Sequence, residues 1–134
     1  MRKVELALIV SDPDQDCERI ISSVRACGLA PICCSNVAGA RMLLPQEGFK
    51  LVFCKEVLSD GDFRAVLREA KRVDPYLPVI VLSHSTDWDF YLKALGVGAF
   101  EVIVCPPNPL EAQNIILSAL ADTIDTEVER RAAA

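Results

Sequence analysis

The chain has 134 residues, of which 51% are hydrophobic and 25% are charged, and its formal net charge is −5. This composition indicates one globular domain that is large enough to bury a core. Nucleic-acid binding is not expected, because it requires clustered basic side chains and the 14 lysines and arginines are scattered among 19 acidic residues. No apolar stretch suits a membrane span and the first residues do not resemble a signal peptide, so we expect a cytoplasmic protein without membrane contact.

Strand and helix signals alternate from the start of the chain. Residues 4–10 form an apolar run that predicts a strand buried on both faces. Asp12 followed by Pro13 predicts the N-cap and first residue of a helix that ends at Gly28. Further strands are predicted at 30–35 and 51–54, and they are separated by a short helix over 37–44.

The alternation continues in the second half. Asp60-Gly61-Asp62 predicts a turn, and Asp62 caps a helix that ends before Pro75. Strands are predicted at 78–82 and 100–104. The helix between them begins near Thr86 and carries an apolar stripe that we expect to be core, namely Trp88, Tyr91, Leu92 and Leu95. A last helix opens at Asn108-Pro109 and runs to Val128.

Five strands that alternate with five helices predict a three-layer α/β/α domain with a parallel sheet, because each parallel strand needs a crossover. The first strand-to-helix turn has no glycine and carries Asp12, Asp14 and Asp16. These carboxylates would repel a pyrophosphate, so a dinucleotide-binding domain is disfavoured and a flavodoxin-like cofactor binder is the least favoured function. We expect no cofactor.

The six cysteines do not show the paired spacing of a zinc site. Cys33, Cys34 and Cys54 lie inside predicted strands, and Cys17 and Cys27 lie on the apolar side of a predicted helix. We therefore expect most of them to be small, buried hydrophobic residues, and no metal site is predicted.

Several motifs at the ends of the predicted strands resemble one family. They are Val57-Leu58-Ser59-Asp60-Gly61-Asp62, Leu82-Ser83, Gly98-Ala99 and Cys105-Pro106. The chain resembles the receiver domain of two-component response regulators over residues 3 to about 125. The resemblance implies a flavodoxin-like fold with strand order 2-1-3-4-5 and a receiver-like domain over residues 1–125. Residues 126–134 are expected to be a C-terminal tail or the start of a linker helix to an absent output domain.

The resemblance also implies where the phosphorylation pocket should lie. The family's acidic pair falls on Ser11 and Asp12, its phosphate-binding hydroxyl on Ser83, and its conserved lysine on Cys105. The acceptor aspartate falls on Lys55, which cannot form an acyl phosphate or bind Mg²⁺. We therefore expect a degenerate pseudo-receiver with no metal and no catalysis of its own.

Two arrangements of Lys55 stay open from the sequence. Its ammonium either pairs with Asp12 and occupies the pocket permanently, or it extends to solvent while Asp12 serves only as an N-cap. Glu56 is an alternative phosphoryl acceptor in a shifted, Mg²⁺-dependent site, or a standing mimic of phosphoaspartate. Strand alternation predicts that Glu56 faces away from the pocket if Lys55 faces into it.

Two further side chains near the pocket raise other possibilities. A thiol beside a lysine has a lowered pKa, so Cys105 suggests a cysteine-based redox sensor as a second alternative. His84, the only histidine, has no evident acidic partner in the sequence and is interpreted as a solvated loop residue.

The favoured function is therefore protein–protein interaction in two-component signal transduction, without phosphorylation. The resemblance implies a contact surface on the fourth helix, fifth strand and fifth helix; the candidates are Trp88, Tyr91, Val102, Leu117 and Ile124. Leu110, Leu117 and Ile124 recur every seven residues, which is typical of helix pairing. The partner is a homodimer mate, another protein or a fused output domain.

Overall fold

A computed structural model describes the backbone of residues 4–133 and the side chains of residues 4–122 and 132. Its centre is a five-stranded parallel sheet in the order β2-β1-β3-β6-β7. The strands are β1 (Leu6–Val10), β2 (Ala30–Cys34), β3 (Phe49–Lys55), β6 (Val79–Ser83) and β7 (Glu101–Val104). Because β6 and β7 are the fourth and fifth predicted strands, the predicted order 2-1-3-4-5 is confirmed.

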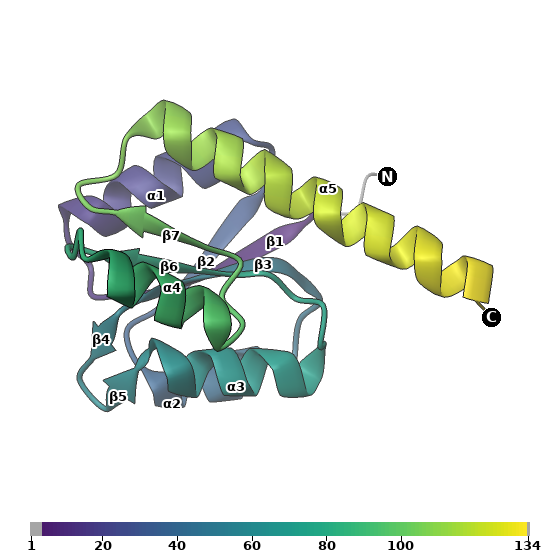
Figure 1. Cartoon of the computed structure of the whole chain (residues 1–134), viewed down its shortest axis with the longest axis horizontal. Helices are drawn as coiled ribbons and strands as arrows, with labels where there is room; N and C mark the ends of the chain where they lie inside the picture. The colour runs from purple at the N-terminus through teal and green to yellow at the C-terminus, as the bar shows by residue number, and fades with distance from the viewer. Residues whose placement is uncertain (1–3, 134) are drawn as a thin grey trace.

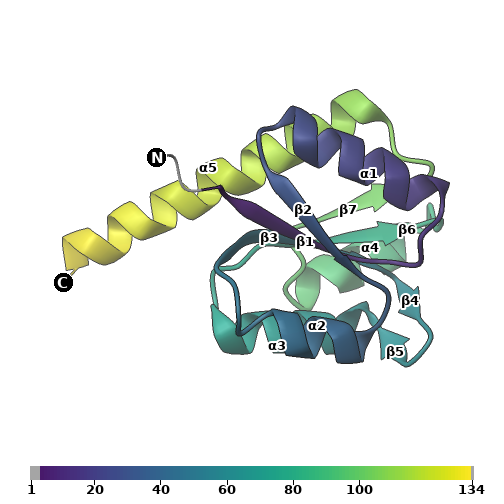
Figure 2. The same ribbon diagram turned by 180° about the vertical axis from the view of Figure 1, so that it is seen from behind.

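Five helices cover the two faces of this sheet. On one face lie α1 (Gln15–Ala26) and α5 (Pro109–Ala133). The other face carries α2 (Val37–Leu43), α3 (Phe63–Val73) and α4 (Trp88–Gly96). Figure 1 and, from behind, Figure 2 show the resulting three layers, which confirm the predicted α/β/α architecture.

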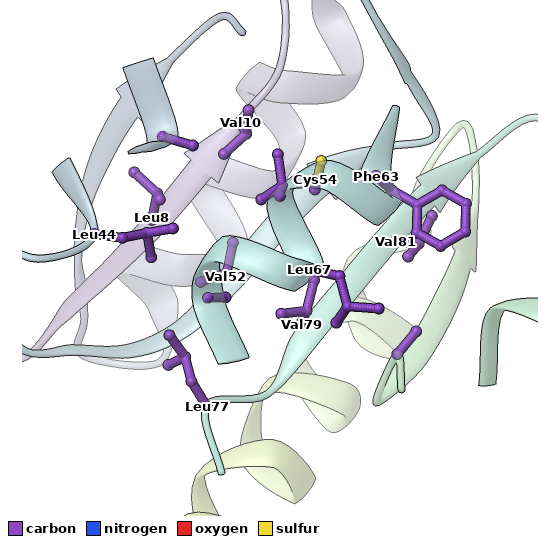
Figure 3. Packing of buried hydrophobic residues seen from close by; sticks show 14 of the residues in the cluster. Leu8, Val10, Leu44, Val52, Cys54, Phe63, Leu67, Leu77, Val79 and Val81 are labelled. Atoms are coloured by element: carbon purple, nitrogen blue, oxygen red, sulfur yellow. The ribbon is translucent and has the colours of Figure 1, made fainter. Parts of the chain in front are cut away.

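The core consists of two clusters that the sheet separates. Alternate residues of one strand point to opposite faces, so in β3 Val52 and Cys54 join the cluster under α2, α3 and α4, whereas Leu51 and Phe53 join the cluster under α1 and α5. Figure 3 shows the first cluster, in which Phe63 and Leu67 of α3 lie over β6. Lys55 lies two residues after Phe53, so the same alternation directs its side chain toward the face covered by α1 and α5.

Two local features differ from the sequence prediction. Helix α1 begins after Asp14, whose side chain accepts a hydrogen bond from the Cys17 N–H at 2.8 Å, so the predicted N-cap at Asp12 is wrong by two residues. Between β3 and α3 the chain forms a small antiparallel pair, β4 (Val57–Leu58) and β5 (Gly61–Asp62). Short strands of two residues leave no periodic signal in a sequence.

Residue Asp60 at the tip of this pair connects it to α2. Its carboxylate accepts hydrogen bonds from the backbone N–H groups of Val37 at 2.8 Å and Ala38 at 3.0 Å. The bond from Val37 is the largest cause of a lowered pKa of Asp60, and together with the bond from Ala38 it outweighs the opposing effect of burial. Asp62 caps α3 as predicted and accepts from the Arg64 N–H at 3.0 Å.

Helix α4 departs most from its predicted packing. Trp88 is 66% exposed and Leu92 is 48% exposed, so the predicted core stripe is wrong for these two residues, whereas Tyr91 packs against the core. The helix packs mainly against β7, the edge strand, and its fully buried residue is Ala94. An edge strand offers only a narrow apolar surface, which leaves the larger side chains of α4 outside.

Helix α5 has 25 residues and continues through the predicted domain boundary at residue 125. In Figures 1 and 2 its C-terminal part extends well beyond the sheet. Within the described residues, no helix has both the length and the apolarity that crossing a membrane requires.

Candidate functional site

The carboxyl ends of β3, β6 and β7 meet at one edge of the sheet, where ligands commonly bind in open α/β folds. A cavity of about 270 Å³ opens there. It is lined by Lys55, Glu56, Val57, Leu82, Ser83, His84, Ser85 and Cys105. Four of the six predicted pocket residues, at positions 55, 56, 83 and 105, are therefore brought together.

The other two predicted pocket residues do not line this cavity. Ser11 is buried, and its hydroxyl donates to the backbone carbonyl of Asp12 at 2.9 Å. The Asp12 side chain is exposed. The pair between Asp12 and Lys55, one of the two arrangements that the sequence left open, is not formed.

The Lys55 ammonium is hydrogen-bonded to Asp14 instead. Asp14 is placed for this contact because it caps α1: one carboxylate oxygen accepts from the Cys17 N–H while the other faces Lys55. The Lys55 side chain is only 20% exposed and that of Asp14 is 37% exposed. Of the two predicted arrangements, the one in which Lys55 extends freely into solvent is thus wrong.

The electrostatics of the pair are mutually consistent. The hydrogen bond to Asp14 raises the pKa of Lys55, burial opposes it, and the charges of Asp14, Asp12 and Asp16 add to the increase. For Asp14, partial burial acts to raise the pKa, but the bonds from Lys55 and the Cys17 N–H outweigh it and the net pKa is lowered. Both groups therefore keep their charges at neutral pH.

Glu56 lies in the same cavity as Lys55, contrary to the prediction from strand alternation. The Ser83 hydroxyl donates a hydrogen bond of 2.5 Å to Oε1 of Glu56, and the Ser85 N–H donates to Ser83 Oγ at 3.0 Å. The reason is that β3 ends at Lys55, so Glu56 lies in a bend where alternation no longer applies. The hydroxyl that the family resemblance assigns to phosphate thus contacts a carboxylate of the chain.

Cys105 is buried, and its pKa is raised rather than lowered. Burial is the main cause, and the charges of Asp16 and Asp14 add to it, so the pKa of the thiol reaches about 11 despite the opposing Lys55 ammonium. The premise of the redox-sensor alternative, a thiol activated by Lys55, is therefore wrong. Of the other cysteines, Cys33 is exposed, contrary to the general expectation of buried thiols, and all six are free.

His84 has the acidic partner that the sequence did not reveal. Its Nε2 lies 3.0 Å from Oδ2 of Asp16, in the first turn of α1. Sequence reasoning thus missed Asp14 and Asp16 as parts of the site. Asp14 carried a usable signal, since an Asp three residues before an apolar helix position is a common N-cap. Asp16 carried none, because its partner is 68 residues away in the sequence, from position 16 to position 84.

The predicted interaction surface is accessible in part, since Trp88 and Leu117 are exposed and Tyr91 is partly buried. Trp88 stacks on Tyr91 with ring centroids 5.1 Å apart, and both line a surface cavity of about 380 Å³ between α4, β7 and α5. Leu110 and Leu117 of α5 are 68% and 55% exposed. Val102 also borders the cavity but is itself buried, and the side chain of Ile124 lies outside the described part of the structure.

Sequence comparison finds relatives among transcriptional regulators. The chain is 25% identical over 122 residues to the transcriptional regulatory protein ZraR of Salmonella typhimurium, which covers 91% of this chain and 28% of that protein. ZraR of Klebsiella oxytoca is 26% identical over 116 residues, or 87% of this chain and 26% of the relative. The chain thus spans little more than a quarter of these curated relatives, and no protein-family profile matches it.

Solved receiver domains have the same fold. A signal receiver domain of a putative Luxo repressor protein from Vibrio parahaemolyticus superposes with a TM-score of 0.84 at 15% identity, over 94% of this chain and 97% of that one. A CheY-like receiver domain protein from Methanospirillum hungatei gives 0.81 at 18% identity, over 92% and 99%. NtrX from Brucella abortus gives 0.83 at 22% identity, over 95% of this chain and 30% of that one.

The solved structures show the fold of this chain. It has the flavodoxin-like fold of response-regulator receiver domains, and its sequence is similar to that of the transcriptional regulatory protein ZraR. Receiver domains of this type are signalling domains rather than conventional enzymes.

Proposed function

We propose that this receiver domain signals through protein contacts without being phosphorylated. The observation that carries the proposal is the ion pair between Lys55, at the end of β3, and the N-cap residue Asp14. Phosphoryl transfer to a receiver needs a carboxylate nucleophile and a divalent cation that neutralises the transferring oxygens. An ammonium at the acceptor position offers no such nucleophile and places a fixed positive charge beside the acidic turn.

The hydrogen bond from Ser83 to Glu56 supports the same proposal. In the family, the corresponding hydroxyl contacts the phosphoryl group, and here a permanent carboxylate accepts its hydrogen bond. Glu56 therefore acts as a built-in substitute for the charged phosphoaspartate, and the domain holds one signalling state.

Contacts with partners are proposed to form on the surface of α4, β7 and α5. Its exposed apolar side chains include Trp88, Leu92 and Val104, and the cavity beside Trp88 is the larger of the two described above. The greater length of the relatives supports a fused output domain that continues from α5, and a homodimer through the same surface is the second form of this contact. We place the protein in the cytoplasm, where six free thiols stay reduced.

The competing function is a Mg²⁺-dependent receiver that is phosphorylated on Glu56 or a nearby Asp. Glu56 favours it because its carboxylate already lies in the cavity with Ser83 and Lys55. The two functions are separated by recording amide chemical shifts of the full chain while Mg²⁺ and beryllofluoride are added, with the Glu56→Gln variant as the matched control.

We expect no saturable shifts around the cavity in either protein. Saturable shifts in the natural chain would overturn the proposal. Their disappearance in Glu56→Gln would assign the phosphoryl site to Glu56, and their persistence would assign it to a nearby Asp. The contact surface is tested by light scattering and partner capture with Trp88→Glu and Leu117→Glu. Met42→Glu is the control, because Met42 is equally exposed on α2, away from this surface.

A further inference from the structure

Three side chains with metal-binding atoms converge next to the Lys55 cavity. Asp16 lies in the first turn of α1, His84 directly follows β6, and Cys105 directly follows β7. One ligand atom from each lies within 4.8 Å of the other two, and Asp16 Oδ2 is 3.0 Å from His84 Nε2. The three segments are far apart in the sequence. They meet only because β6 and β7 end, and α1 begins, at the same edge of the sheet.

The set of atoms selects a particular kind of metal. An imidazole nitrogen, a thiolate sulfur and a carboxylate oxygen are the three ligand types of protein-bound Zn²⁺. Zinc bonds of roughly 2.0 to 2.3 Å place tetrahedral ligand atoms about 3.3 to 3.8 Å apart, so a small rotation of these side chains would suffice. Mg²⁺ prefers oxygen ligands throughout and does not suit a site with a sulfur.

Burial gives the cluster a closed side and an open side. Cys105 is buried and the Asp16 side chain is only 14% exposed, whereas His84 is 69% exposed. A cation could therefore enter from the side of His84, with Asp16 and Cys105 behind it. Three protein ligands would leave a fourth position for water, which is the pattern of an open zinc site.

We propose that Asp16, His84 and Cys105 form a binding site for a zinc-like divalent transition metal. Binding removes the proton of the Cys105 thiol, which is released to solvent as the sulfur–metal bond forms. The site goes beyond the proposed function, because it gives the domain an input that is independent of phosphate. It also uses none of the residues of the Lys55–Asp14 pair.

The test is a titration of the reduced, metal-free full chain with Co²⁺. The absorption spectrum of bound Co²⁺ shows whether sulfur is a ligand and which coordination geometry the ion adopts. We expect one equivalent to produce a thiolate-to-cobalt charge-transfer band and the strong visible bands of a tetrahedral site, and Zn²⁺ to displace both. Cys105→Ser should abolish the charge-transfer band. The control Cys33→Ser should retain the band, because Cys33 is exposed on β2. This strand and β7, which precedes Cys105, are the two outermost strands on opposite sides of the sheet.

His84→Ala keeps the test decisive if Cys105→Ser does not fold, because His84 is exposed and its loss should leave the fold intact. This variant should bind Co²⁺ at least tenfold more weakly and should lose the rise in melting temperature that Zn²⁺ gives the natural chain. No charge-transfer band in the natural chain, or a band that survives in Cys105→Ser, would overturn the proposal and leave the contact between His84 and Asp16 without a metal.

Discussion

The ion pair between Lys55 and Asp14 makes a quantitative prediction for a double-mutant cycle. Lys55→Met removes the ammonium but keeps most of the aliphatic chain. Asp14→Asn removes the charge but keeps an N-cap that ranks as high as Asp, so the bond to the Cys17 N–H is preserved. The cycle therefore isolates the interaction between the two side chains.

The expected coupling follows from the burial of the pair. Two charges 4 Å apart in a partly buried setting attract by about 4 kcal/mol, and desolvation removes a large part of this. Because the side chains are 20% and 37% exposed, solvent screening reduces the attraction further. We expect a coupling of about 1.5 kcal/mol in the free energy of unfolding, measured by urea denaturation at pH 7.

A second ion pair, which is open to solvent on its arginine side, serves for comparison. Arg41 Nε lies 3.3 Å from Glu69 Oε1, and the two side chains are 60% and 14% exposed. The cycle of Arg41→Met and Glu69→Gln should give about 0.2 to 0.5 kcal/mol. If the coupling of Lys55 with Asp14 is no larger than that of this control, Lys55 is effectively solvated and the occupied-pocket argument is refuted.

Three further predictions concern pH, the core and a tight contact. The difference in stability between the natural chain and Lys55→Met should persist at neutral pH and shrink on acidification. The pKa of Asp14 is lowered from 3.8, so the contribution of this carboxylate is lost as the pH falls through its folded-state pKa. The pKa of Lys55 is raised from 10.5, so at alkaline pH the difference is lost only above 10.5. An unchanged difference at pH 2, measured once circular dichroism has confirmed that both proteins are folded there, would contradict this assignment. Phe53→Ala should cost about 3 to 5 kcal/mol in urea unfolding, because Phe53 is fully buried in the central strand; a cost below about 1 kcal/mol would mean that the cluster under α1 and α5 is loosely packed. Gly39→Ala should lower the stability by about 1 to 3 kcal/mol, because its new methyl would lie 2.9 Å from Cys34 Cβ, whereas the control Gly48→Ala, with nothing within 4 Å, should be nearly neutral; equal effects would refute the contact.

Local patterns in the sequence determined the architecture. Apolar runs marked the five strands of the sheet, and the helical spacing of Ile20, Val24 and similar residues marked the faces that cover it. With right-handed crossovers, these elements allow few topologies, and the predicted order was confirmed. The sequence also placed Lys55, Ser83 and Cys105 at strand ends, which was enough to locate the pocket.

Only the tertiary structure decided which side chains interact there. Asp14 rather than Asp12 reaches Lys55, because the helix begins two residues later than the sequence indicated. Glu56 turns toward Ser83 because the strand has already ended, and the meeting of Asp16, His84 and Cys105 depends on three chain segments that no local pattern connects. Hydrophobic periodicity fixes the face on which a residue lies, whereas hydrogen bonds and ion pairs depend on displacements of a few ångströms that folding alone determines.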